Sequence, residues 1–277
     1  MHKKIGRQTV ELINKPCIIG RGTVVGQKEG QGPLSKDFDI ILDDDMYGQK
    51  SWEKAESKML KEAMYKAVNR AGLEPMQIDV MLCGDLINQL MSSSFAARDM
   101  HIPFLGLYGA CSTMTESLVL SSMLVDGGFF NYALAGASSH FCTAERQFRM
   151  PVEHGNQRPP SAQWTATAAG AVVVSSVDKM PQGQKQKPYL VRAESATIGK
   201  VIDAGIKDAN QMGAAMAPAA VDTLLNHIED TGRDLEYYDL IVSGDLGHIG
   251  RDIAMDLLAD AGFNKKSIKQ HYNDCGT

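Results

Sequence analysis

An internal repeat is the feature that most constrains what this chain can fold into. Residues 72–86, GLEPMQIDVMLCGDL, align without gaps on residues 232–246, GRDLEYYDLIVSGDL. A segment with apolar residues at helical spacing precedes each stretch, at 53–70 and at 213–230. Each copy predicts a helix, a glycine that ends it, a short turn and an apolar strand. Two such copies predict a duplicated α/β fold.

A second match follows the first in each copy. The hexapeptide YGACST, which contains Cys111, aligns on YNDCGT, which contains Cys275. Because the matches keep their order along the chain, they favour a duplication over coincidence. We expect an N-terminal half at residues 1–184 and a C-terminal half at residues 185–277.

The first half alternates strand-like and helix-like segments. Its apolar runs are short and apolar on both sides, which is typical of buried parallel strands, and they lie at 16–25, 79–84, 102–107, 132–138 and 169–177. The helix-like segments between the first four runs lie at 53–70, 88–100 and 112–126. This alternation predicts a parallel sheet with right-handed crossover helices.

Composition and charge argue against several classes of protein. The net charge of −5, without a dense basic block, argues against non-specific binding to nucleic acid or to an acidic membrane. The N-terminus lacks the apolar segment of a signal peptide, and no run reaches the roughly 18 apolar residues of a membrane span. The five cysteines show neither CxxC nor Cys/His spacing, so neither a disulfide framework nor a zinc site is indicated. We expect a soluble protein from a reducing compartment.

Several long motifs carry a resemblance to a known family. They include YGQKSWEKAE, GDLINQ, IPFLGLYGACSTMTES, ASSHFCTAERQFRMPVEHGNQRP and HYNDCGT. The duplicated halves, with a cysteine at the third strand-to-helix turn, resemble the thiolase-like fold, a layered αβαβα arrangement. Within that superfamily the motifs are similar to the stage V sporulation protein AD family, and the similarity runs from about residue 5 to residue 277.

The resemblance implies a function in spores. Members of this family are soluble proteins that bind dipicolinic acid (pyridine-2,6-dicarboxylate), taken up with calcium during sporulation. They act with the SpoVA membrane proteins at the inner membrane of the forespore. For this chain the resemblance therefore implies a peripheral, homodimeric binding protein, with no cofactor of its own except calcium accompanying dipicolinate.

The end of the chain departs from the family pattern. Family members continue beyond NDCG through a further helix and two strands, whereas this sequence stops at Thr277. From the repeat we expect an incomplete second half, which would leave an apolar face of the helix at 112–126 uncovered.

Cys111 is the first candidate site residue. A cysteine at a helix N-terminus has its thiolate favoured by the helix dipole, and the same N–H groups favour a bound anion, so Cys111 and Ser112 are candidate ligand contacts. The plain alternative is an inert buried cysteine, because unpaired cysteines are often buried.

The second half decides whether Cys111 could be a nucleophile. Ketoacyl synthases bring a histidine to this cysteine, but the corresponding strand end here reads VSGDLGHIG, which places Asp245 near that position and His248 three residues later. Asn273 resembles the asparagine element. We expect condensing chemistry to be lost, with Asp245, His248 and Asn273 as ligand candidates. An acyltransferase that uses Cys111 with Asn273 is the alternative, and a purely structural subunit is a third interpretation.

Three further candidates lie in SSHFCTAERQFR, directly after a strand. Arginine forks match carboxylates, so we expect His140, Arg146 and Arg149 near a dicarboxylate. The alternative is an exposed loop whose arginines form weak surface ion pairs.

Asp85 and Asp245 occupy matching strand ends in the two copies. They could hold calcium through their oxygens, but an aspartate at this place more often caps the following helix, and we predict capping for both. No dedicated metal site is predicted.

Overall fold

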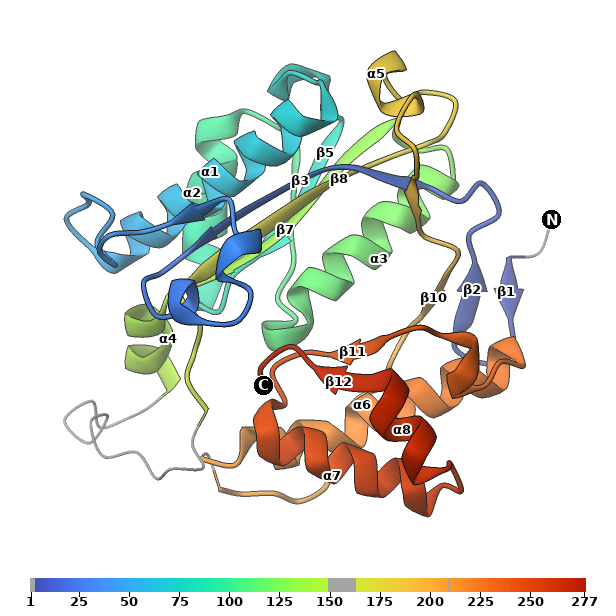
Figure 1. Cartoon of the computed structure of the whole chain (residues 1–277). Helices are drawn as coiled ribbons and strands as arrows, with labels where there is room; N and C mark the ends of the chain where they lie inside the picture. The colour runs from blue at the N-terminus through green and yellow to red at the C-terminus, as the bar shows by residue number, and fades with distance from the viewer. Residues whose placement is uncertain (1–2, 149–162, 209) are drawn as a thin grey trace. The chain divides into compact units, whose positions relative to one another are not determined.

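The computed structural model describes residues 3–148, 163–208 and 210–277. Arg149, a predicted ligand contact, lies outside the described residues. The described residues form two compact units (Figure 1). The large unit contains residues 12–148 and 164–194, and the small unit contains 3–11, 163 and the described residues from 195 to 277. The boundary between duplicated halves predicted at residues 184–185 stays a prediction.

The large unit is built on one mixed sheet. Its hydrogen-bonded order is β4-β3-β8-β7-β5-β6, and β9 also pairs with β3. The strands are β3 (Cys17–Val25), β4 (Ile40–Ile41), β5 (Val80–Gly84), β6 (Phe104–Gly106), β7 (Tyr132–Ser139), β8 (Ala168–Ser175) and β9 (Val191–Arg192). The predicted runs thus fold as β3, β5, β6, β7 and β8.

The prediction of parallel strands is wrong for β8. β5 runs parallel to both β6 and β7, but β8 is antiparallel to β7 and to β3. The register explains the direction, because Ala168 at the start of β8 pairs with Ser139 at the end of β7. β8 therefore starts at the end of the sheet where β7 stops, and it runs back antiparallel beside β7.

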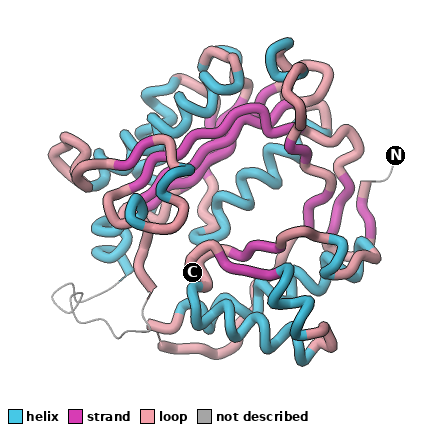
Figure 2. Tube along the Cα trace, viewed as in Figure 1, coloured by secondary structure: helices cyan, strands magenta, loops and turns pink. Residues whose placement is uncertain are grey.

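Helices cover both faces of this sheet (Figure 2). The α-helices of this unit are α1 (Trp52–Ala71), α2 (Met91–Met100), α3 (Thr113–Asp126), α4 (Phe141–Phe148) and the single turn α5 (Gln182–Lys185). In β5, Met81 and Cys83 belong to the core beneath α1 and α2, whereas Val80 and Leu82 pack with the α3 core. This alternation of side chains places α1 and α2 on one face and α3 on the other.

Glycines bring α1 very close to β3. A Cβ atom at Gly20 would lie 2.0 Å from the carbonyl oxygen of Ala67, and one at Gly22 would lie 2.0 Å from that of Ala63. Only glycine permits this approach of helix to strand. Ser51 caps the start of α1 by accepting from the Lys54 N–H.

The small unit has two short sheets and three helices. Antiparallel β1 (Lys4–Ile5), β2 (Thr9–Glu11) and β10 (Ser195–Thr197) form one sheet, and parallel β11 (Ile241–Ser243) and β12 (Tyr272–Asp274) form the other. Its helices are α6 (Met212–Thr231), α7 (Gly247–Asp260) and α8 (Lys265–His271). Their apolar faces form a core around Ala217, Leu235, Leu258 and Ile268.

The two copies of the repeat fold alike. In each, a 20-residue helix ends at a left-handed glycine, Gly72 after α1 and Gly232 after α6. A 3₁₀ turn and a parallel strand follow in both copies, at Pro75–Gln77 before β5 and at Leu235–Tyr237 before β11. The helix, capping glycine, turn and strand predicted from the repeat are therefore confirmed.

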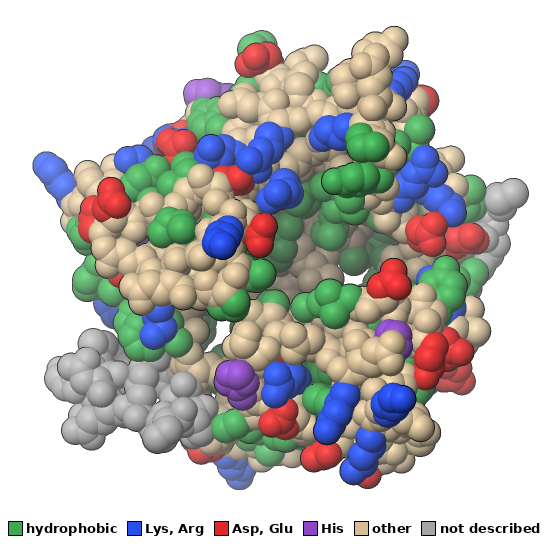
Figure 3. Space-filling model, in the orientation of Figure 1, with side chains coloured by type: hydrophobic (Ala, Val, Ile, Leu, Met, Phe, Trp, Pro, Cys, Tyr) green, Lys and Arg blue, Asp and Glu red, His purple; other side chains and the backbone are tan. Residues whose placement is uncertain are grey.

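The surface of the described chain carries mixed charge. Lysine and arginine side chains are interspersed with aspartate and glutamate on the face shown in Figure 3. Among the described residues, none of the helices combines the length and apolar character needed to cross a membrane.

Candidate functional site

The candidate site of the large unit lies at the carboxyl ends of β5, β6 and β7. Because these strands are parallel, the loops that follow them meet at one edge of the sheet. Gly84 ends β5, and a Cβ atom there would lie 1.9 Å from the carbonyl oxygen of Leu107. A glycine at this position therefore lets the Cys111 loop pack directly against the end of β5.

Cys111 lies in the turn between β6 and α3 and is exposed. It occupies a 3₁₀ turn, Ala110–Ser112, in which Ala110 has a left-handed backbone, with φ of 48°. The Ser112 hydroxyl donates to the Gly109 carbonyl at 2.8 Å instead of capping α3. The Thr113 hydroxyl accepts from the Gly109 N–H at 3.2 Å. The helix that begins at Thr113 therefore has no side-chain cap from Ser112 on its first N–H groups.

His140 follows β7 and is fully buried. Its Nε2 lies 2.8 Å from the Asp45 carbonyl oxygen, and its Nδ1 accepts from the Cys142 N–H at 3.2 Å. These contacts assign a neutral ring with the proton on Nε2. Its place in a ligand pocket stays a prediction, because a ligand would have to displace one of these backbone bonds.

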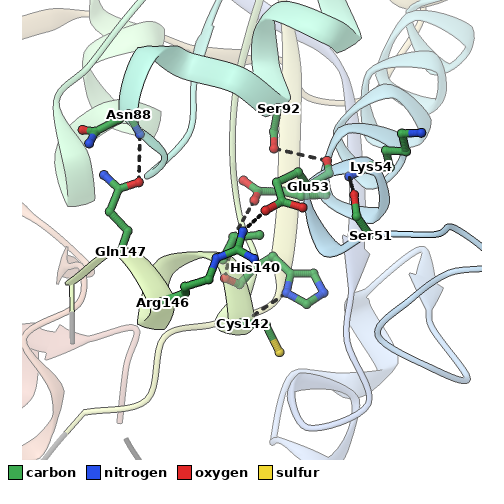
Figure 4. Close-up of polar contacts among 11 residues, drawn as sticks. Ser51, Glu53, Lys54, Asn88, Ser92, His140, Cys142, Arg146 and Gln147 are labelled. Atoms are coloured by element: carbon green, nitrogen blue, oxygen red, sulfur yellow. Dashed lines mark hydrogen bonds and ion pairs between the residues drawn. The ribbon is translucent and has the colours of Figure 1, made fainter. Parts of the chain in front are cut away.

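Arg146, on α4, pairs with Glu53 in the first turn of α1 (Figure 4). The guanidinium also lies 5.9 Å from the ring centroid of Trp52. Half of the Arg146 side chain remains exposed, with 52% relative accessibility. Its donors can therefore reach a second anion without giving up the Glu53 contact.

A polar network joins the loops of this edge. The Asn88 N–H donates to Gln147 Oε1 at 3.0 Å (Figure 4). The Tyr108 hydroxyl donates to Asn88 Oδ1 at 3.3 Å. The side-chain amide N–H groups of Asn88 and Gln147 donate no hydrogen bond to the described residues. Sequence reasoning missed both residues, although Asn88 lies in the quoted motif GDLINQ.

Two buried carboxylates lie beneath these loops. Glu56, on α1, accepts hydrogen bonds from the Ser138 and Thr143 hydroxyls, both at 3.0 Å. Asp85 accepts from the Ile87 N–H at 2.8 Å and from the N–H and hydroxyl of Ser93 at 2.7 and 2.6 Å. The predicted capping role of Asp85 at the start of α2 is thereby confirmed.

Burial is the main reason why the pKa of Glu56 is raised to about 7, and repulsion from Asp85 adds to the shift. Burial and Asp85 likewise raise the pKa of the Cys83 thiol well above its usual range. Glu56 therefore titrates near neutral pH, although it lies inside the unit.

The small unit presents a second set of candidates where β11 and β12 end. Asp245 and His248 are exposed, and His248 lies in the first turn of α7. Asn273 is exposed in β12 and accepts from the Thr277 hydroxyl at 3.3 Å. The Cys275 N–H donates to the Ser243 carbonyl, which brings the Cys275 turn beside the Gly244–Asp245 turn.

The predicted capping by Asp245 is wrong. Asp245 has a left-handed backbone, with φ of 62°, and the N-cap position of α7 falls on Leu246, whose side chain makes no cap hydrogen bond. The buried carboxylate of Asp274 takes this role, accepting from the Gly247 N–H at 3.0 Å, the Leu246 N–H at 3.3 Å and the Ser243 hydroxyl at 2.8 Å. Asp274 aligns on Ala110 of the first copy, which has no carboxylate. The repeat alone could therefore not indicate that Asp274, and not Asp245, caps α7.

The surroundings of Cys275 disfavour a thiolate. Burial of the sulfur is the main cause that raises the pKa of Cys275, and the carboxylates of Asp245 and Asp274 add repulsion. In the described part of the chain, no group of three or more histidine, cysteine, aspartate or glutamate side chains could hold a metal ion.

A separate groove of about 500 Å³ lies between α1 and α2. None of the predicted site residues lines it. Its walls are mixed in charge and come from Gln49, Lys54, Ser57, Lys58, Lys61, Glu62, Phe95, Arg98 and Asp99.

The fold is similar to that of several solved structures. The 3-oxoacyl-[acyl-carrier-protein] synthase III of Aquifex aeolicus superposes with a TM-score of 0.55 and 15% identity, covering 94% of this chain and 86% of that one. Cerulenin-bound OleA from Xanthomonas campestris gives 0.60 and 12% identity, covering 98% and 85%. At this identity the likeness concerns the fold, and it defines a thiolase-like α/β protein.

The chain belongs to the stage V sporulation protein AD family, whose model matches residues 6–277. Stage V sporulation protein AD of Bacillus subtilis (strain 168) is 43% identical over 274 residues, which cover 99% of this chain and 77% of that protein. The thiolase-like fold and the sporulation family expected from the motifs are therefore both confirmed.

Proposed function

We propose that this chain binds dipicolinic acid, together with calcium, and catalyses no reaction on it. Membership of a sporulation family supports this proposal, because the family resemblance implies dipicolinate as the ligand. In the same proposal the chain acts at the inner membrane of the forespore with SpoVA membrane proteins.

The start of α3 carries the proposal. Its first N–H groups receive no side-chain cap from Ser112, and Cys111 beside them is exposed. The Thr113 N–H already donates to the Ala110 carbonyl, so a carboxylate here would be favoured by the dipole of α3 and by the N–H groups that follow Thr113. Asn88 and Gln147 contribute side-chain amide donors to the same edge of the sheet, and Arg146 contributes part of an exposed guanidinium. This set of donors suits a planar dicarboxylate.

The small unit supports binding over acyl transfer. A condensing enzyme needs a base or polarising group beside its cysteine. The strand end where ketoacyl synthases supply histidine holds Gly244 and Asp245 here. Burial is the main cause that raises the pKa of the neighbouring thiol, Cys275, so this turn offers neither a base nor a thiolate. We therefore expect Cys111 to form no stable acyl-enzyme.

Arg146 provides the test of the site. If it pairs a ligand carboxylate, Arg146→Ala should weaken dipicolinate binding by roughly 1.5–3 kcal/mol, the scale for hydrogen bonds to charged groups. Glu53→Gln is the matched control, because it removes the ion-pair partner but keeps the guanidinium. Unchanged or tighter binding by Glu53→Gln supports direct contact. Equal weakening in both variants would mean that Arg146 only holds α4.

We also propose that the chain forms a homodimer through β6. This strand is the edge of the large unit's sheet, so one side of its backbone is unpaired within the described residues. Leu105 in β6 and Tyr108 beyond it are exposed apolar side chains, at 48% and 54%. A second copy that pairs along β6 would satisfy the backbone and cover both side chains.

A further inference from the structure

We propose that Glu56 is a proton-sensitive positioning residue, whose protonation locks the loops of the candidate site in place. The two oxygens of its carboxylate contact two elements that border the site, through Ser138 at the end of β7 and Thr143 in α4. Asp85, its acidic neighbour, holds the start of α2 through Ser93. The buried pair of Glu56 and Asp85 therefore holds α4 and the start of α2 against α1 and β5.

No cation balances this pair among the described residues that contact it. Asp85 faces Glu56 from the end of β5, and its charge opposes ionisation of Glu56. From α4, Arg146 is paired with Glu53, and the ring of His140 is engaged by backbone groups. When Glu56 ionises, two negative charges are therefore held by hydroxyl and amide donors alone, which disfavours the closed arrangement.

Thr143 supplies a second arrangement for the protonated state. Its hydroxyl lies 3.0 Å from Glu56 Oε2 and also 3.0 Å from the His140 carbonyl oxygen. With Glu56 ionised, Thr143 donates to the carboxylate. With Glu56 protonated, the new O–H can donate to Thr143, which turns its own proton to the His140 carbonyl. The proton comes from solvent, and the Glu56 carboxyl group and the Thr143 hydroxyl keep a hydrogen-bond partner in both states.

We call Glu56 and Asp85, with the hydrogen bonds that they accept, the latch. It holds elements that carry residues of the candidate site. α4 carries Arg146 and Gln147, and the segment before α2 carries Asn88. Opening of either element would displace the donors at the carboxyl edge. Order in the site should be greatest below pH 4.5 and should fall as the pH rises through 7. An effect on dipicolinate affinity, weaker at pH 8 than at pH 6, rests on the proposed function, whereas the latch itself does not.

Hydrogen exchange without ligand tests the latch separately from ligand binding. Protection factors, which correct for the intrinsic rate, are measured at pH 5.5 and 7.5 for amides of residues 86–93 and 141–148. If opening returns Glu56 to its ordinary pKa, the opening constant rises about tenfold per pH unit up to pH 7, so protection should fall roughly 30-fold.

Two variants make the result decisive. Glu56→Gln, which mimics the protonated acid, should abolish the pH-dependent fall, while Glu62→Gln, elsewhere on α1, should keep it. Equal loss of protection in the wild type and Glu56→Gln, or no loss in either, would overturn the inference. Failure of dipicolinate to bind would leave the exchange result untouched and would count against the proposed function alone.

Discussion

Glu56 also makes a quantitative prediction about stability. Its pKa rises from 4.5 in the unfolded chain to about 7 in the folded one. The folded state thus holds a proton that the unfolded state has lost, so this contribution to stability is complete below pH 4.5 and disappears as the pH rises through 7. At 1.36 kcal/mol per pKa unit, the shift corresponds to about 3 kcal/mol, to within an order of magnitude.

The Glu56→Gln variant isolates this contribution. The amide carries no charge, can accept from Ser138 and can donate to Thr143, which then donates to His140. We expect the variant to gain about 3 kcal/mol relative to the wild type between pH 4.5 and pH 8. Comparing the difference at two pH values cancels any cost of the amide's own geometry, because that cost does not depend on pH.

Tryptophan fluorescence is a suitable probe for urea unfolding of the large unit. Both tryptophans of the chain, Trp52 and Trp164, belong to that unit, and Trp52 begins the helix that carries Glu56. Glu62→Gln is the control on the same helix. A Glu56→Gln effect that is the same at pH 5 and pH 8 would mean that Glu56 keeps an ordinary pKa and that burial does not shift it.

Three further predictions concern other parts of the chain. Asp274→Asn should destabilise the small unit by roughly 1–3 kcal/mol, because buried N–H groups lose an acceptor; urea unfolding followed by circular dichroism checks this, with exposed Asn273→Ala as a neutral control. Hydrogen bonds from the Arg7 and Gln8 N–H groups lower the pKa of Asp230 from 3.8 to about 2. Protection of the β1–β2 amides against hydrogen exchange should therefore hold above pH 3.8 and be lost as the pH falls through 2. The variant Asp230→Asn should reduce this protection at pH 7. Leu105→Lys should convert a dimer into monomers in sedimentation equilibrium, and an unchanged dimer would exclude β6 as the interface.

Sequence pattern predicted most of the large unit because local signals carry it. The strands and helices of the first half follow apolar periodicity, and the glycines at 72 and 232 end their helices as expected. The antiparallel direction of β8 could not be predicted, because a buried apolar run looks the same in either direction.

The candidate site was harder to predict than the fold. Nothing in the spacing of Glu56 indicates that it meets Ser138 and Thr143, which lie more than 80 residues further along the chain. Asp274 takes over the capping expected of Asp245 because parallel pairing of β11 and β12 brings their ends together. Both findings depend on contacts between distant segments, which periodicity and motif spacing do not encode.

Calorimetric titration of the unmodified chain with dipicolinate, with and without calcium, is the direct test of dipicolinate binding. Acetyl-CoA is titrated in parallel, and the protein is recovered for intact mass measurement. The account predicts saturable binding of dipicolinate and an unchanged protein mass after acetyl-CoA. No saturable dipicolinate binding, together with an acetyl adduct that disappears in Cys111→Ala, would contradict it and identify an acyltransferase.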